Sequence, residues 1–160
     1  MSDATREVVR TLVLCALPWI SPVTQAVVDA VLARRGRLGG DSNAFARELG
    51  YRNRHHLAYQ LKGDGLIPLR ELAAWIRVLG WVREWEVSGT ALCRMALESG
   101  ADSSVFYDTV QGVTGMPSSE ASEAGCAFLV LRLREQCAPP PKARGRARRR
   151  ALAAGGPLGR

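Results

Sequence analysis

The chain has 160 residues, nearly half of them apolar, which suits one compact domain or two very small ones that share a core. Its net charge is +7, yet residues 1–141 hold fifteen basic and fifteen acidic residues, while residues 142–160 hold seven basic and no acidic ones. The four cysteines form no CxxC pair and no zinc-ligand spacing, so we expect buried, reduced thiols rather than a disulfide or metal framework.

An apolar segment near the N-terminus raises the question of a signal peptide. Arg10 and Pro18 confine its uninterrupted apolar run to seven residues, and the charges before it balance. No other stretch approaches the roughly 20 apolar residues that a membrane span needs. The sequence therefore favours a cytoplasmic protein without a leader or a span.

Two helices are expected before residue 37. Residues 4–17 repeat apolar side chains at helical spacing, and Pro18 ends that helix. Ser21 then caps a second helix that has Pro22 at its first position and stops at Gly36. The apolar stripe expected on this second helix comprises Val23, Ala26, Val27, Ala30 and Val31.

A repeat with an offset of 50 residues follows. "FARELG" (45–50) matches "MALESG" (95–100) at three positions, and Gly65 matches Gly115. Each copy is typical of a helix–turn–helix unit. In the first, Asp41 or Ser42 caps a helix through Leu49, and a second helix covers 54–63. In the second, Ser88 caps a helix through Ser99, and Asp102 caps a helix over 103–112.

A long helix over 68–85, opened by Pro68, separates the copies, and a last helix covers 119–136. Trp75, Trp81 and Trp85 on the long helix are expected to be core or half-buried, and Trp81 could also be covered by the first 20 residues or by a partner chain. We therefore expect an all-α protein: two helix–turn–helix subdomains joined by a long linker helix, an N-terminal helix and a disordered basic C-terminal tail. The N-terminal helix is expected over 1–20 and the first subdomain over 21–67. The linker helix is expected over 68–87, the second subdomain over 88–138 and the tail over 139–160.

Two helix–turn–helix units joined by a long helix resemble the DNA-binding module of the AraC-type (arabinose-operon regulator-like) transcription factors. The residues that carry the resemblance are "FARELGYRNRHHLAYQLKGDGLIP" and "ALESGADSSVFYDTVQGVTGMP", within 23–125. In the second segment, an aromatic followed by "TGMP" is similar to the family's closing motif, although the spacing from Leu61 to Gly65 and from Gly100 to Phe106 is one residue short. The resemblance implies DNA binding and transcriptional control. It implies no small-molecule effector, because only the first 20 residues stand where the family's effector domain would be.

On this interpretation, residues 52–63 are the turn and the recognition helix of the first unit. Leu57 and Leu61 face the core, while the start of the helix meets base edges in the major groove, where Arg suits guanine and Asn suits adenine. A helix N-terminus favours acidic residues, and basic ones here are the kind of local conflict expected at a functional site. The expected DNA contacts are Arg52, Asn53, Arg54, His55, His56, Gln60 and Lys62.

In the second unit the corresponding helix begins with an acidic residue instead of basic ones. It has Asp102 at the cap, no Lys or Arg over 101–114, and Asp108, which would repel phosphate. We therefore expect the first unit to carry most of the DNA contact, with Ser103, Ser104 and Gln111 able to hydrogen-bond in the second. The basic tail is expected to contact phosphates through Lys142, Arg144, Arg146, Arg148, Arg149 and Arg150.

Other interpretations of residues 52–63 stay open: a solvated helix end, a metal site at His55 and His56, or an acid–base centre. With only two histidines, no nucleophile motif and no glycine-rich phosphate loop, we expect neither an enzyme nor a cofactor. The expected partners are double-stranded DNA and, by protein contact, RNA polymerase or another regulator. The alternative function is a protein-interaction module derived from a helix–turn–helix, with only non-specific attraction of nucleic acid through the tail.

Overall fold

The computed structural model describes residues 1–91, 94–95, 97 and 102–139. In this part of the chain the protein is all-α, as expected, with seven helices and no strand. The basic tail residues named above lie outside the described residues. The helices are α1 (Asp3–Ala16), α2 (Pro22–Ala33), α3 (Ser42–Glu48), α4 (Arg54–Gly63), α5 (Leu69–Ser88), α7 (Ser103–Thr114) and α8 (Ser118–Gln136).

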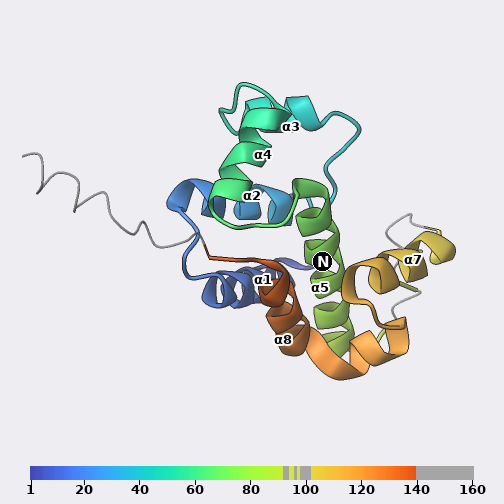
Figure 1. Cartoon of the computed structure of the whole chain (residues 1–160). Helices are drawn as coiled ribbons and strands as arrows, with labels where there is room; N and C mark the ends of the chain where they lie inside the picture. Colours follow the sequence, from blue (N-terminus) through green and yellow to red (C-terminus); the bar gives the residue numbers. More distant parts are fainter. Residues whose placement is uncertain (92–93, 96, 98–101, 140–160) are drawn as a thin grey trace, which may run out of the picture.

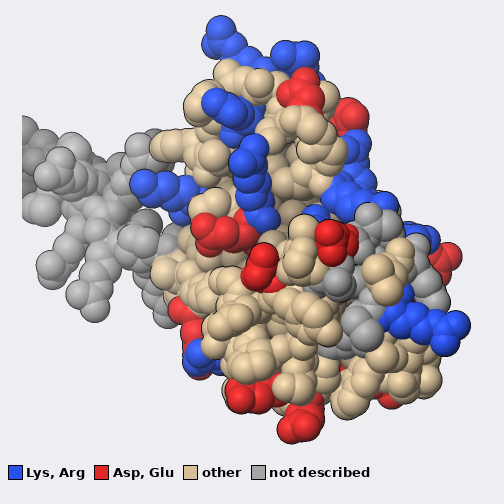
Figure 2. Space-filling view, turned by 90° about the vertical axis from the view of Figure 1, so that its right-hand side faces the viewer, with Lys and Arg blue, Asp and Glu red and all other residues tan. Residues whose placement is uncertain are grey.

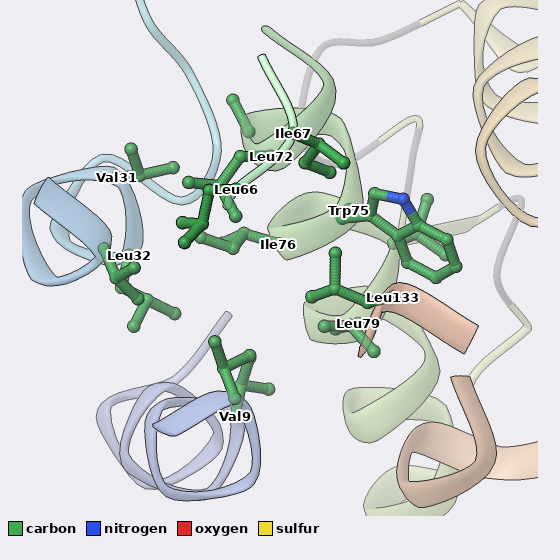
Figure 3. Packing of buried hydrophobic residues seen from close by; sticks show 14 of the residues in the cluster. Val9, Val31, Leu32, Leu66, Ile67, Leu72, Trp75, Ile76, Leu79 and Leu133 are labelled. Carbon is green, nitrogen blue, oxygen red and sulfur yellow. The ribbon is translucent and has the colours of Figure 1, made fainter. Parts of the chain in front are cut away.

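Helix α5 lies at the centre of the fold, and α1, α2, α7 and α8 pack against it (Figure 1). Leu72, Ile76 and Leu79 of α5 are fully buried, as their helical spacing predicts. Figure 3 shows these side chains converging with Val9 of α1 and Leu133 of α8. The N-terminal helix is therefore built into the same hydrophobic core as α5. None of the helices described here is long and apolar enough to cross a bilayer.

Helices α3 and α4 pack against each other at one end of the molecule (Figure 1). Asp41 caps α3 by accepting from the backbone N–H of Asn43. Leu57 and Leu61 of α4 are each 1% exposed, so the expected core face of this helix is confirmed. The bounds of α4, Arg54–Gly63, also agree with the expected 54–63.

The end of α4 is tied to the start of α2 through Asp64. Its carboxylate accepts from the backbone N–H of Ser21 at 2.9 Å and from the Ser21 hydroxyl, and its carbonyl accepts from Trp19 Nε1 at 3.1 Å. Partial burial acts to raise the pKa of Asp64, but hydrogen bonds from Ser21, Thr24 and Gln60 outweigh it and hold the pKa below its usual value. The ionised carboxylate thus fixes α4 against the body of the protein.

The buried face of α2 differs from the expected stripe. Val23 is 55% exposed and Ala26 is also exposed, whereas Thr24, Val28 and Leu32 are buried. Alanine and valine lie on most sides of this helix, so apolar spacing alone does not show which side is buried. Thr24 is buried because its hydroxyl has a polar partner in the cap residue Ser21.

One expected helix boundary was wrong, and one expected helix is kinked. Ser88 does not begin a helix: it is the last residue of α5, and its hydroxyl donates to the Glu84 carbonyl and accepts from Thr90 N–H. The last helix, Ser118–Gln136, has the expected bounds, but Gly125 with φ +82° breaks its regular path. Glu86 of α5 restarts it by accepting from the backbone N–H of Cys126 at 2.7 Å, as a capping side chain does.

Trp81 is covered from within the chain. Its ring lies 4.8 Å from that of Phe106 on α7, and both side chains are buried. The core packing expected for Trp81 is therefore confirmed. Its indole fixes α7 against α5.

Candidate nucleic-acid interface

One face of α4 is turned entirely to solvent. Opposite the buried Leu57 and Leu61, Tyr59 is 78% exposed. Its exposed neighbours on the helix and the preceding turn are Arg52, Arg54, His55, His56, Ala58 and Lys62. The structure therefore brings most of the predicted contacts of the first unit onto a single surface, which we call the α4 face.

In the part of the chain that the structure describes, no carboxylate pairs with the basic side chains of the α4 face. Neither Arg52, Arg54 nor Lys62 forms a salt bridge within the described residues, and the first turn of α4 holds no acidic side chain. By contrast, Arg34 beside α3 pairs with Glu48. Uncompensated cations at a helix start are costly for the fold, so an acidic partner suits this surface.

Two neutral amides hold the start of α4. The side-chain oxygen of Asn53 accepts from His56 N–H at 2.9 Å, and that of Asn43 on α3 accepts from Arg54 N–H at 3.1 Å. Capping occupies the Asn53 oxygen, which leaves its amide hydrogens for an outside acceptor. The caps satisfy the helix end without adding negative charge to the α4 face.

Two of the predicted contacts are turned partly toward the protein. The His56 ring meets Tyr51 edge-on, with centroids 5.4 Å apart. Gln60 donates to the Ser21 hydroxyl at 3.4 Å and faces Asp64, so its amide belongs to the anchor between α4 and α2. Arg52, Arg54, His55 and Lys62 remain as the outward polar residues.

Sequence reasoning did not assign a role to Tyr59. It is the most exposed large hydrophobic side chain of the helix, and its hydroxyl can donate to or accept from a ligand. A signal was available, since Tyr59 lies four positions after His55 and three before Lys62, and therefore on the same side of the helix as both.

The predicted contacts of the second unit lie on α7, which stands apart from α4 with α5 between them (Figure 1). Ser104 and Gln111 are exposed, and Ser103 is the first residue of the helix. Asp102 caps α7 as expected, by accepting from Ser104 N–H at 3.2 Å. The exposed surface of α7 also carries Val105 and Tyr107, at 51% and 48% exposure, and is thus more apolar than the α4 face.

No three His, Cys, Asp or Glu side chains among the described residues are placed to hold a metal ion. No protein-family model matches the chain, and no curated protein or solved structure does so either. The chemistry of the α4 face therefore has to be judged from its own geometry.

Proposed function

We propose that the protein binds double-stranded DNA sequence-specifically and regulates transcription, with α3 and α4 as a helix–turn–helix unit and α4 as its recognition helix. The observation that carries the proposal is the α4 face, where Arg52, Arg54 and Lys62 lie exposed without carboxylate partners among the described residues. Such a surface offers both attraction to phosphate and donors for base edges.

The geometry of α4 suits this role. Asn43 and Asn53 cap the helix, so its first residues are held in place while Arg54 and His55 point to solvent. Asp64 and Ser21 anchor the other end of the helix. A recognition helix needs this combination of an exposed start and a fixed body, because its first residues enter the groove.

In this proposal, the second helix–turn–helix unit would place α7 against the DNA. Its lack of basic side chains over 101–114 supports a minor part in DNA binding, through Ser104 and Gln111. This tandem arrangement, with α5 as the linker, is the form that the resemblance to AraC-type regulators implies. The cytoplasm is the compartment that this function requires.

A second candidate function is a protein-interaction module, and the exposed Val105 and Tyr107 on α7 favour it. On that account the α4 face would attract acidic molecules without reading sequence. Both functions can coexist in a regulator whose α7 contacts RNA polymerase or another regulator.

Selection of bound duplexes from a random DNA pool distinguishes the two candidates. The DNA-binding proposal expects a common site to be enriched over successive rounds. If the pool bound after selection is as diverse as the starting pool, sequence-specific binding is refuted and the interaction module is the better account.

A further inference from the structure

A hollow of about 440 Å³ lies between the segment that precedes α3 and the first turns of α5. It is lined by Gly36 and Arg37 of the loop among others, by Ser42 at the start of α3, and by Arg70 and Arg77 of α5. Its lining, all within the described residues, contains three arginines and no carboxylate. We call it the arginine hollow.

Two of these arginines have no counter-charge among the residues that the structure describes. Neither Arg70 nor Arg77 forms a salt bridge within the described part of the chain. Arg77 donates from Nη2 to the Gly36 carbonyl at 2.8 Å, but its Nε is buried and has no hydrogen-bond partner among the described residues. A buried guanidinium donor without an acceptor is costly, and an added anionic oxygen would relieve that cost.

The loop at Gly36 packs closely against α5, and this packing shapes the arginine hollow. Gly36 has φ +72°, and a Cβ there would lie 2.4 Å from the Ala73 carbonyl oxygen of α5. The loop therefore lies directly on α5 only because residue 36 is glycine. Burial and the nearby charge of Arg37 lower the pKa of Arg77, which indicates how closely the positive groups are gathered.

The arginine hollow adjoins the α4 face. Ser42 lines the hollow, and the next residue, Asn43, accepts from Arg54 N–H at the start of α4. In Figure 2 most Lys and Arg side chains lie over the upper part of the molecule, the end built by α3, α4 and the loop before α3 in Figure 1. A ligand in the hollow would thus lie one residue from the contact that positions α4.

We propose that the arginine hollow binds a phosphate group through Arg70 and Arg77. Guanidinium groups match the geometry and charge of phosphate oxygens, and the hollow is wide enough to admit a phosphate that is part of a larger molecule. Two sources share this chemistry: a free phosphorylated small molecule and a phosphate of the DNA backbone. In the second case the site rests on the proposed function and extends it.

The test is a titration of the full-length ¹⁵N-labelled protein with pyrophosphate, followed by the amide signals of Gly36, Gly39 and Gly40. Arg70 is the residue to change, because it is exposed and has no hydrogen bond within the described residues. We expect saturable shifts in all three glycines, and Arg70→Gln should weaken the apparent affinity by about tenfold or more. The matched control is Arg35→Gln, which removes the same charge beside Gly36 from a side chain that does not line the hollow.

The absence of saturable shifts would overturn the proposal, as would equal weakening by Arg35→Gln and Arg70→Gln, which would show general charge attraction. The titration needs no DNA, so it stays decisive if the proposed function fails.

A second arm of the experiment adds the selected duplex. Displacement of the duplex by pyrophosphate, with weaker duplex binding in Arg70→Gln, assigns the hollow to a backbone phosphate. Pyrophosphate binding that leaves the duplex bound assigns it to a small phosphorylated ligand.

Discussion

The side-chain oxygen of Asn43 accepts the backbone N–H of Arg54 at 3.1 Å, so a residue of α3 caps the first turn of α4. This contact explains how a helix can begin with an arginine and two histidines and still have its end satisfied. The contact also gives the backbone and the side chain of Arg54 separate roles. Its backbone serves the fold, while its guanidinium is exposed and free of carboxylates within the described residues.

The first prediction follows from this separation. Replacing Arg54 with Glu and His55 with Ala should leave the free energy of unfolding unchanged or raise it by about 0.3–1 kcal/mol, because a carboxylate complements the helix N-terminus. The same change should abolish preference for the selected DNA site, since a base contact worth about 1–3 kcal/mol is lost. Urea unfolding and competition between selected and random duplex measure the two effects.

The control for this prediction is Arg6→Glu, which makes the same change of charge near the start of α1, away from the α4 face. It should leave site preference intact. Earlier unfolding of the double variant would mean that Arg54 and His55 are structural, and retained preference would mean that α4 does not read the site.

The second prediction concerns Tyr59. Because its side chain is 78% exposed, Tyr59→Ala should change the free energy of unfolding by no more than about 0.5 kcal/mol. If its hydroxyl bonds to DNA, the affinity should fall about 2- to 12-fold, the range of a single neutral hydrogen bond. Fluorescence anisotropy with a labelled duplex measures this change. Tyr107→Ala on α7 is the matched control, and equal losses in both variants would remove the special role of the α4 face.

The third prediction is a dependence of stability on pH. Hydrogen bonds hold the pKa of Asp64 below its unfolded value of about 4, so its contribution is fully present above that pH and is lost as the pH falls through the folded-state pKa. Asp64→Asn should cost about 1–3 kcal/mol at pH 7, because it weakens charge-assisted bonds to Ser21. The difference from the parent protein should shrink below pH 4.

Denaturant unfolding at a series of pH values tests this third prediction. The exposed Asp108 on α7 supplies the control, because Asp108→Asn removes a carboxylate without a described hydrogen bond and should shift stability by no more than about 0.5 kcal/mol. A difference between Asp64→Asn and the parent that persists unchanged at pH 3 would contradict the assignment to an ionised carboxylate.

The fourth prediction concerns thiol reactivity. Burial, with the charge of Glu86 adding to it, raises the pKa of Cys126 to about 12, and burial raises the pKa of Cys137 as well. At pH 8 only about 1 in 10,000 Cys126 thiols is then ionised, whereas Cys15 is exposed. In a Cys93→Ser background, maleimide should label Cys15 first and the other two only on unfolding. Peptide mapping by mass spectrometry identifies the sites, and fast native labelling of Cys126 would refute its burial.

Sequence patterns were reliable where two signals agreed. The helix at Arg54–Gly63 follows the turn at Gly50 and carries Leu57 and Leu61 four residues apart, and both its bounds and its buried face were predicted. The α2 face was missed because valine and alanine cover most of that helix. The break at Gly125 was missed because Glu86, distant in sequence, supplies the cap that makes it stable.

The arginine hollow could not be predicted from spacing alone. Arg70 and Arg77 are seven residues apart and so share a helix face, but the loop that closes the hollow reaches α5 only through Gly36. That contact joins residues about 40 positions apart. It depends on tertiary packing, which no local pattern encodes.

The fifth prediction concerns the basic residues 142–160. If all seven contact phosphate, they release counterions and contribute up to about −6 to the slope of log affinity against log salt concentration. Deleting 142–160 should therefore flatten the slope and weaken binding to selected and random duplexes alike, because phosphate contacts carry no sequence information. Gel shifts over a salt series measure the slope for both duplexes.

The Arg54→Glu, His55→Ala variant provides the converse control for the tail deletion: it should lose preference for the selected site but keep most of the salt dependence that the tail supplies. An unchanged slope after the deletion would show that the tail does not contact DNA, and a loss of preference would show that it helps to read the site.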